Sequence, residues 1–352
     1  MRVTHVLRIT VAAVTAAAVL SPAPAAAQAA TAPAKPAAAP ASRVPPGWTA
    51  PRTPWGEPDL QGTYSNRTIT PFERPANVGG REFFTPEEVA ALEKRASEQS
   101  GDDDRNKGTR ADVERAYNDF WWDRGTKVTT LRTSMVVDPP DGRVPAQTEE
   151  ARKRAAEESK QPAFRGAGAS GRGTDSWLDR STFERCITRG MPGAMSPTAY
   201  NNNYRITQGP GFVAIQVEML GGTRVIPTDG RAHVNSSIRQ WVGDSVGRWE
   251  GDTLVVETTN FSDKILYRGA AENLHLVERI RRIGPDEIDY RVTISDPTTF
   301  TRPWTLAIPY VNTGEQMFEY ACHEGNYGME GILSGAREDE RKAAAPKPAV
   351  TQ

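Results

Sequence analysis

Residues 275–295 read HLVERIRRIGPDEIDYRVTIS, which is two runs of alternating polar and apolar residues joined by Gly284-Pro285-Asp286-Glu287. An alternation with a period of two is typical of a strand that buries one face, and glycine, proline and aspartate favour a tight turn. The stretch therefore predicts an antiparallel β-hairpin.

The segments around this hairpin show the same pattern. They are residues 212–220 with 223–226, the strand 253–259 after the turn at 247–252, and residues 305–311 with 316–322. No helical pattern separates these segments. The sequence therefore predicts a mainly β fold, an antiparallel meander that forms a lipocalin-like barrel or a strongly curved sheet. An open sandwich is the alternative.

The N-terminal half combines short strands with helices. Thr85-Pro86-Glu87-Glu88 supplies the N-cap threonine, the proline and the acidic residues that start a helix, which should run to about Ser97. A second helix, highly charged, is expected at 148–160, and short strands are expected at 60–66 and 128–137. The glycine-rich residues 166–174 lack the Gly-Lys-Ser/Thr ending of a phosphate-binding loop and predict a flexible loop.

The N-terminus has the pattern of a secretory signal. Arg2 and Arg8 accompany an apolar run at 9–20 that is too short to span a bilayer, and Ala25-Ala26-Ala27 supplies the small residues that a signal peptidase requires. We expect cleavage near Ala27 and a periplasmic or secreted protein. The expected division is a signal peptide at 1–27, an Ala/Pro-rich tether at 28–47, a segment with helices at 48–180 that packs on the β domain, the β domain at 181–337 and a disordered tail at 338–352.

Bulk properties narrow the expected partners. The formal net charge of −1 gives no general electrostatic reason to bind nucleic acid or an anionic membrane. After the signal, no apolar run approaches the ~18 residues of a membrane span. The two cysteines, Cys186 and Cys322, can form a disulfide in an oxidising compartment, and two buried thiols are the alternative.

The hairpin at 275–295 also suggests candidate site residues. If its four-residue loop pairs Ile283 with Ile288, then Arg279 lies opposite Val292, and His275 shares that face. The face of Val292 is apolar, so Arg279 and His275 are expected to point into the barrel. A register shift of one residue would turn both outward.

A buried arginine is costly unless it is paired, and a structural ion pair with a satisfied core histidine is the alternative to a binding site. The candidate partners of the inward arginine are a ligand carboxylate or one of Glu218, Glu257 and Glu319.

The predicted catalytic residues are His275, His323, Arg279 and Glu319. Either histidine would act as acid or base near neutral pH, and Arg279 would hold an anionic or polar oxygen. In the predicted strand at 316–322, Glu319 lies on the face that His323 continues. With His233, the two histidines would also suit zinc or iron, although no local spacing is a metal signature.

Polar and aromatic residues provide weaker candidates for substrate binding. Asn202 and Tyr204, within YNNNY at 200–204, would line the entrance for a polar ligand or simply form a turn. Trp241 and Trp249 are candidates for the aromatic walls of a substrate site. The alternative is that both tryptophans simply pack in the core. The sequence has no Gly-x-Ser-x-Gly elbow and no His-Glu-x-x-His helix, which disfavours the common esterase and metalloprotease classes.

Two longer motifs point to a family. Residues 247–261 (GRWEGDTLVVETTNF) and 320–328 (YACHEGNYG) resemble motifs of a family of exported bacterial proteins that are usually labelled hypothetical. Residues 53–62 (TPWGEPDLQG) and 272–275 (ENLH) extend the resemblance over most of the mature chain. The resemblance implies export, but it implies no activity and no site residues.

Three functions fit these features. The first is an exported enzyme that acts on a small or medium organic molecule by hydrolysis, elimination or isomerisation at a pocket lined by histidine and arginine. The second is a lipocalin-like, non-catalytic protein that binds a small molecule. The third is an interaction module of the cell envelope, presented on the Ala/Pro-rich tether.

Overall fold

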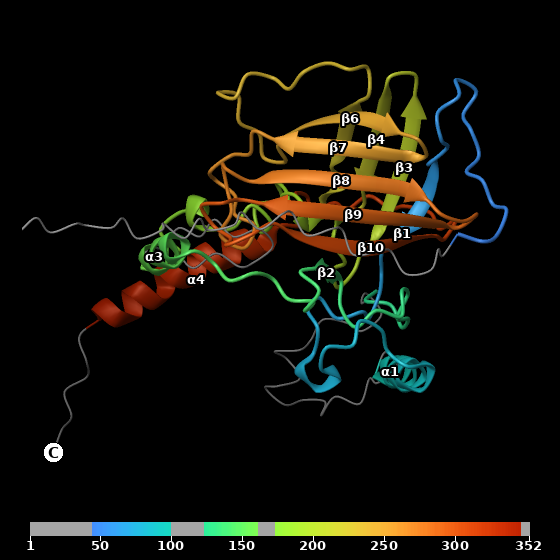
Figure 1. The fold of residues 1–352 in the computed structure, drawn as a ribbon. Coiled ribbons are helices and arrows are strands. Elements are labelled where there is room, and N and C mark those ends of the chain that lie inside the picture. Colours follow the sequence, from blue (N-terminus) through green and yellow to red (C-terminus); the bar gives the residue numbers. More distant parts are fainter. Residues whose placement is uncertain (1–43, 100–122, 161–172, 346–352) are drawn as a thin grey trace, which may run out of the picture. The chain divides into compact units, whose positions relative to one another are not determined.

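The computed structural model describes residues 44–99, 123–160 and 173–345. Its main element is an antiparallel sheet in the order β5-β4-β3-β1-β10-β9-β8-β7-β6, with β2 paired to β10 off this path (Figure 1). The strands are β1 (Gly62–Ser65), β2 (Val136–Asp138), β3 (Asn203–Gly209), β4 (Phe212–Val217), β5 (Thr223–Pro227), β6 (Asp244–Glu250), β7 (Thr253–Thr259), β8 (His275–Arg282), β9 (Glu287–Ser295) and β10 (Trp304–Asn312).

In the chain, one α-helix lies between β1 and β2, one between β2 and β3, and one after β10. They are α1 (Pro86–Gln99), α3 (Glu149–Glu158) and α4 (Tyr327–Ala344), with short 3-10 turns η1 (Ala76–Val78), η3 (Trp177–Asp179), η4 (Gly193–Met195) and η5 (Met219–Gly221). Helix α1 starts as predicted, because Thr85 and Glu88 cap each other's backbone N–H groups at 3.3 and 2.8 Å. Helix α3 is capped by the Thr148 hydroxyl, which accepts from the Ala151 N–H at 3.0 Å.

The sheet curls into a nearly closed barrel because its edge strands β5 and β6 meet. The Arg224 Nε on β5 donates to the Ser245 Oγ on β6 at 2.9 Å. Two residues further along β5, Ile226 packs against Gly247 of β6. A Cβ on this glycine would lie only 2.9 Å from the Ile226 Cγ2. The predicted antiparallel meander and its closure into a barrel are therefore confirmed.

Large side chains from alternate strand positions fill the barrel interior. On β9 every second residue is buried, and the same holds for β8 and much of β10. The largest fully buried side chains include Trp304, Tyr64, Tyr204, Tyr290 and Tyr310. Tyr310 stacks between Tyr204 and Tyr290, with ring centroids 4.9 and 5.2 Å away.

A buried ion pair crosses this interior. The Arg224 Nη1 donates to the Glu278 Oε1 at 2.8 Å, and the Tyr290 hydroxyl donates to the same oxygen at 2.8 Å. Thr258 accepts from the Arg224 Nη2 at 2.7 Å. Burial raises the pKa of the Tyr290 hydroxyl, and the Glu278 carboxylate raises it further. The charges are thus paired and hydrogen-bonded, as a stable low-dielectric interior requires.

The register of the β8–β9 hairpin differs from the predicted one. Arg282 pairs with Ile288, so the loop holds five residues where four were predicted. This slip of one residue turns Leu276, Glu278 and Ile280 inward, and Arg279 faces outward opposite Arg291. The prediction that His275 and Arg279 project into the barrel is therefore wrong.

Other segments also differ from the predictions. Residues 316–322 form no strand, and β10 pairs instead with β9, β1 and β2. In the predicted strand at 128–137, only the end belongs to β2. Helix α4 continues to Ala344, into the tail predicted to be disordered. The signal peptide, nearly all of the tether and most of the glycine-rich loop lie outside the described residues.

Residues 186–196, which we call the plug, pack into the barrel interior. The Met195 carbonyl accepts from the Tyr310 hydroxyl at 2.7 Å and from the Asn66 Nδ2 at 3.1 Å. The Ala194 carbonyl accepts from the Tyr204 hydroxyl at 3.1 Å. At its start, Cys186 forms the predicted disulfide with Cys322. The plug thus fills space that a ligand would occupy in an open barrel.

Candidate ligand-binding site

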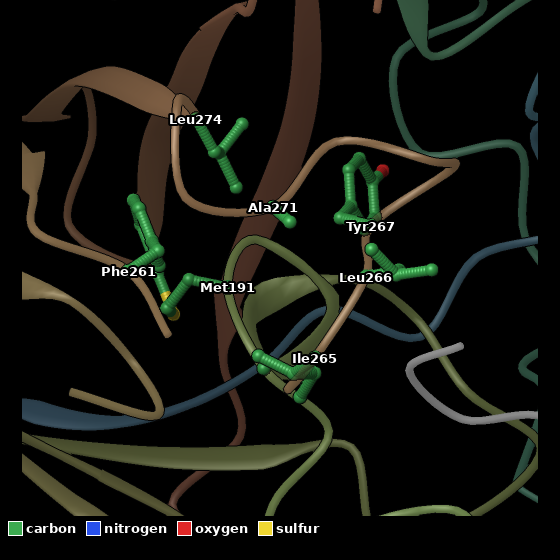
Figure 2. Close-up of a pocket in the computed structure, with 8 residues that line it drawn as sticks. Met191, Phe261, Ile265, Leu266, Tyr267, Ala271 and Leu274 are labelled. Atoms are coloured by element: carbon green, nitrogen blue, oxygen red, sulfur yellow. The ribbon is translucent and has the colours of Figure 1, made fainter. Parts of the chain in front are cut away.

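An apolar cleft lies where the plug meets the loop between β7 and β8 (Figure 2). Its lining residues are Gly190 and Met191 from the plug and Phe261, Ile265, Leu266, Tyr267, Ala271 and Leu274 from the loop. Figure 2 shows the side chains of Met191, Phe261 and Leu274 gathered on one side and those of Leu266 and Tyr267 on the other. The cleft is therefore built from two segments that are about 70 residues apart in sequence.

The cleft is narrow. The space between its walls is about 200 Å³ when the solvent at the open mouth is included. Its enclosed part has room for roughly one water molecule. Such a cleft can seat one small apolar group of a ligand whose remainder lies at the surface. It is not the large internal cavity of an open barrel.

A cationic group lies beside this cleft. Arg189 directly precedes the lining residues Gly190 and Met191, and it interacts electrostatically with the hydroxyl of Tyr267. Burial raises the pKa of Tyr267, while Arg268 and Arg189 lower it. The arrangement combines apolar walls with two arginines, Arg189 and Arg268, at their edge.

The predicted catalytic residues of the β8 strand lie on the outer face of the barrel. The His275 Nε2 contacts the Glu257 Oε1 at 2.7 Å, and its Nδ1 lies 3.5 Å from the Ser295 Oγ. The hydrogen bond to His275 lowers the pKa of Glu257, against the opposing effect of burial. Arg279 is about half exposed and donates to Glu250 at 3.0 Å. Its partner is thus none of the three predicted carboxylates.

The other two predicted histidines lie apart from this pair. The His233 Nδ1 contacts the Asp244 Oδ2 at 2.7 Å, and its buried Nε2 has no hydrogen-bond partner among the residues that the structure describes. His323 is exposed in the turn before α4. Among the residues that the structure describes, no three His, Cys, Asp or Glu side chains are arranged to hold a metal ion. The predicted three-histidine zinc or iron site is therefore not assembled.

The remaining candidates are mostly structural. Glu319 is exposed in an irregular segment, so it does not share a strand face with His323. Asn202 is fully buried and fixes the backbone of Thr198 and Asp123, and the Tyr204 hydroxyl is bonded to the plug. Neither lines the apolar cleft. Trp249 packs against the core cluster, and Trp241 is half-buried in the loop before β6.

Sequence reasoning missed Arg189 and the Arg224–Glu278 pair. A signal for Glu278 was present, because Leu276 and Ile280 put two apolar residues on its face and the opposite face has only Val277. No local pattern marks Arg189, since its surroundings come from residues 183–204, the loop after β7 and the segment after β10.

Comparison with protein-family models and with curated proteins finds no match for this chain. Among solved structures, a single-residue mutant of the fluorescent protein UnaG is similar over 38% of this chain and 86% of its own length. The sequence identity is 14% and the TM-score is 0.22. A similarity at this level supports no conclusion about function, so the description of the barrel rests on its own strand pairing.

None of the described helices combines the length with the apolar composition that crossing a bilayer demands.

Proposed function

We propose that this protein is an exported, non-catalytic β-barrel protein that binds a small molecule through the apolar cleft between the plug and the β7–β8 loop. The observation that carries this proposal is the concentration of Met191, Phe261, Ile265, Leu266 and Leu274 around one opening. Apolar walls with few polar groups are the usual composition of small-molecule sites.

The packing of the barrel favours the cleft over the interior as the binding site. The interior holds the stacked tyrosines, Trp304 and the Arg224–Glu278 pair, whose hydrogen bonds a ligand would have to break. The cleft lies where the β7–β8 loop packs on this core, and its lining residues belong to none of the paired strands.

A cleft substitution tests the proposal. In a protein labelled at its methionine and leucine methyl groups, 1-hexanol should shift the NMR signals of Met191 and Leu266 saturably. Leu266→Asp should weaken this binding by at least about tenfold, because it places a charge among the apolar walls. Leu131→Asp, at a position that is 52% exposed and does not line the cleft, is the control. Wild-type protein without saturable shifts at the cleft would contradict the proposal.

Export is supported by the signal-like N-terminus, by the family resemblance and by the Cys186–Cys322 disulfide, which suits an oxidising compartment. Expression of the full chain with its own N-terminus tests this part. N-terminal sequencing of periplasmic protein should give a mature chain that begins at Gln28. Retention of the uncleaved chain in the cytoplasm would reject export.

The outer-face histidine favours a second candidate, the exported enzyme. Glu257 holds His275, and the Ser295 hydroxyl lies near the opposite ring nitrogen, which is an arrangement that can activate a serine. Turnover of a panel of p-nitrophenyl esters should then be lost in both His275→Ala and Ser295→Ala, and kept in His323→Ala. Equal turnover by all variants, or none by the wild type, would reject this candidate.

A further inference from the structure

Among the described residues, Arg189 is a nearly buried arginine without a carboxylate partner. Most of the buried arginines have one, and Arg74, which has none, donates to the Thr133 hydroxyl and to the Gly80 and Pro140 carbonyls. Arg224 pairs with Glu278, Arg180 with Glu184 and Arg132 with Glu82. Within the described part of the chain, no carboxylate pairs with Arg189, and its Nε is buried without a hydrogen-bond acceptor. The protein itself therefore leaves this cation uncompensated.

The surroundings of Arg189 are aromatic. Its guanidinium carbon lies 5.8 Å from the centre of the Phe183 ring. The ionisable groups with the strongest electrostatic effect on it are the hydroxyls of Tyr204, Tyr200, Tyr267 and Tyr320. Tyr200 and Tyr320 stack with ring centroids 6.3 Å apart. Neutral tyrosines and a phenyl face stabilise a cation by less than a carboxylate would.

The charge on Arg189 cannot be removed by loss of a proton. Burial lowers the pKa of this guanidinium, but arginine stays protonated in proteins at any physiological pH. A partly desolvated charge without a counter-ion costs stability. An anion that arrives with a ligand would offset this cost, and the planar fork of the guanidinium matches a carboxylate with two hydrogen bonds.

The position of Arg189 connects it to the cleft. The next two residues along the chain line the cleft, and so does Tyr267, whose hydroxyl interacts electrostatically with Arg189. The apolar opening has room for only a small group. The ligand that suits both features has a short apolar chain and one negatively charged end.

We infer that Arg189 is the anion-binding residue of the cleft, and that the ligand is a small organic carboxylate whose terminal methyl group enters between Met191 and Leu266 while the rest of its chain lies at the surface. This inference rests on the binding function proposed above and adds the chemical class of the ligand.

The test compares hexanoate with 1-hexanol, which share a six-carbon chain and differ in the charge of the polar end. Methyl-detected NMR titration of the folded full-length mature protein should give hexanoate at least about tenfold tighter binding than 1-hexanol. Arg189→Gln should remove this advantage and leave 1-hexanol binding unchanged. Arg185→Gln removes the same charge four residues earlier in the chain, at a guanidinium that lies over Trp177, and should change neither affinity.

The outcomes separate the two proposals. If both ligands bind equally to the wild type, or if Arg189→Gln keeps the preference for hexanoate, the anion-binding role of Arg189 is overturned and the cleft remains a binding site. If neither ligand binds at the cleft, the proposed binding function itself is overturned. Circular dichroism and thermal unfolding of each variant establish that it is folded, and Arg189→Lys, which keeps the charge, should retain part of the preference.

Discussion

At the scale of single residues, the Arg224–Glu278 pair stabilises the barrel only as long as both partners are present. Glu278→Ala would leave the Arg224 guanidinium buried without its counter-ion. We expect the free energy of unfolding to fall by about 3–5 kcal/mol, as is typical when one partner of a buried pair is removed. Urea denaturation of the purified protein measures this loss.

Two variants separate the loss of the pair from the loss of a carboxylate in general. The double variant Arg224→Met/Glu278→Leu should be more stable than Glu278→Ala, because an apolar pair replaces the unpaired charge. Glu250→Gln, which removes the partner of the exposed Arg279, should change the stability far less. An equal effect of Glu278→Ala and Glu250→Gln would refute the structural role of the interior pair.

The contact between His275 and Glu257 makes a prediction about pH. The hydrogen bond to His275 is the main cause that holds the pKa of Glu257 below its ordinary value of 4.5. Because the folded-state pKa is the lower one, the stability from this contact is present above the unfolded pKa and is lost as the pH falls through the folded pKa. His275→Ala should therefore raise the pKa of Glu257.

Carbon-detected NMR titration of the Glu257 carboxyl measures this change. His323→Ala removes an exposed imidazole elsewhere and should leave the Glu257 titration unmoved. An unchanged midpoint in His275→Ala would show that the outer-face contact does not govern the carboxyl.

At the scale of the elements, the sequence predicts the identity of the paired segments more reliably than the register in which they pair. Alternation identifies β8 and β9, and Gly284-Pro285 identifies the turn between them. The loop length is not encoded by alternation, because both four and five residues fit this turn. A change of one residue exchanges the faces of a whole strand, and for that reason a four-residue loop predicts the wrong side for His275 and Arg279.

Engineered cross-links test the observed register. Val277 lies directly opposite Thr293 on the outer face, so Val277→Cys with Thr293→Cys should form a disulfide on mild oxidation. Val277→Cys with Arg291→Cys is the control, because diagonal neighbours lie roughly 7–8 Å apart, beyond the usual reach of a disulfide. Peptide mapping by mass spectrometry identifies the bonds. A cross-link to position 291 in preference to 293 would contradict the register.

At the scale of the whole molecule, the barrel could be predicted and the plug could not. The alternation of polar and apolar residues and the turn residues between the strands predict a meander of hairpins from local sequence alone. The disulfide is predicted because an exported chain has only two cysteines. Residues 186–196 have no periodic pattern, and their place depends on the hydroxyls of Tyr204 and Tyr310 from two different strands. The cleft depends on the plug, so it was beyond sequence reasoning as well.

The Cys186–Cys322 disulfide ties the start of the plug to the segment between β10 and α4, and it closes a loop with a sequence separation of 136 residues. Closing a loop of this length removes much of the entropy of the unfolded chain, so Cys186→Ser/Cys322→Ser should lower the free energy of unfolding by about 2–5 kcal/mol. Urea denaturation with and without dithiothreitol provides the measurement and its control together. Reductant should destabilise the wild type by a similar amount and leave the double variant unaffected.

Since Met191 is part of the plug, the variant without the disulfide should also bind 1-hexanol more weakly at the cleft. A wild-type protein whose unfolding is insensitive to reductant would show that the plug is held by its tyrosine hydrogen bonds and its packing without help from the disulfide.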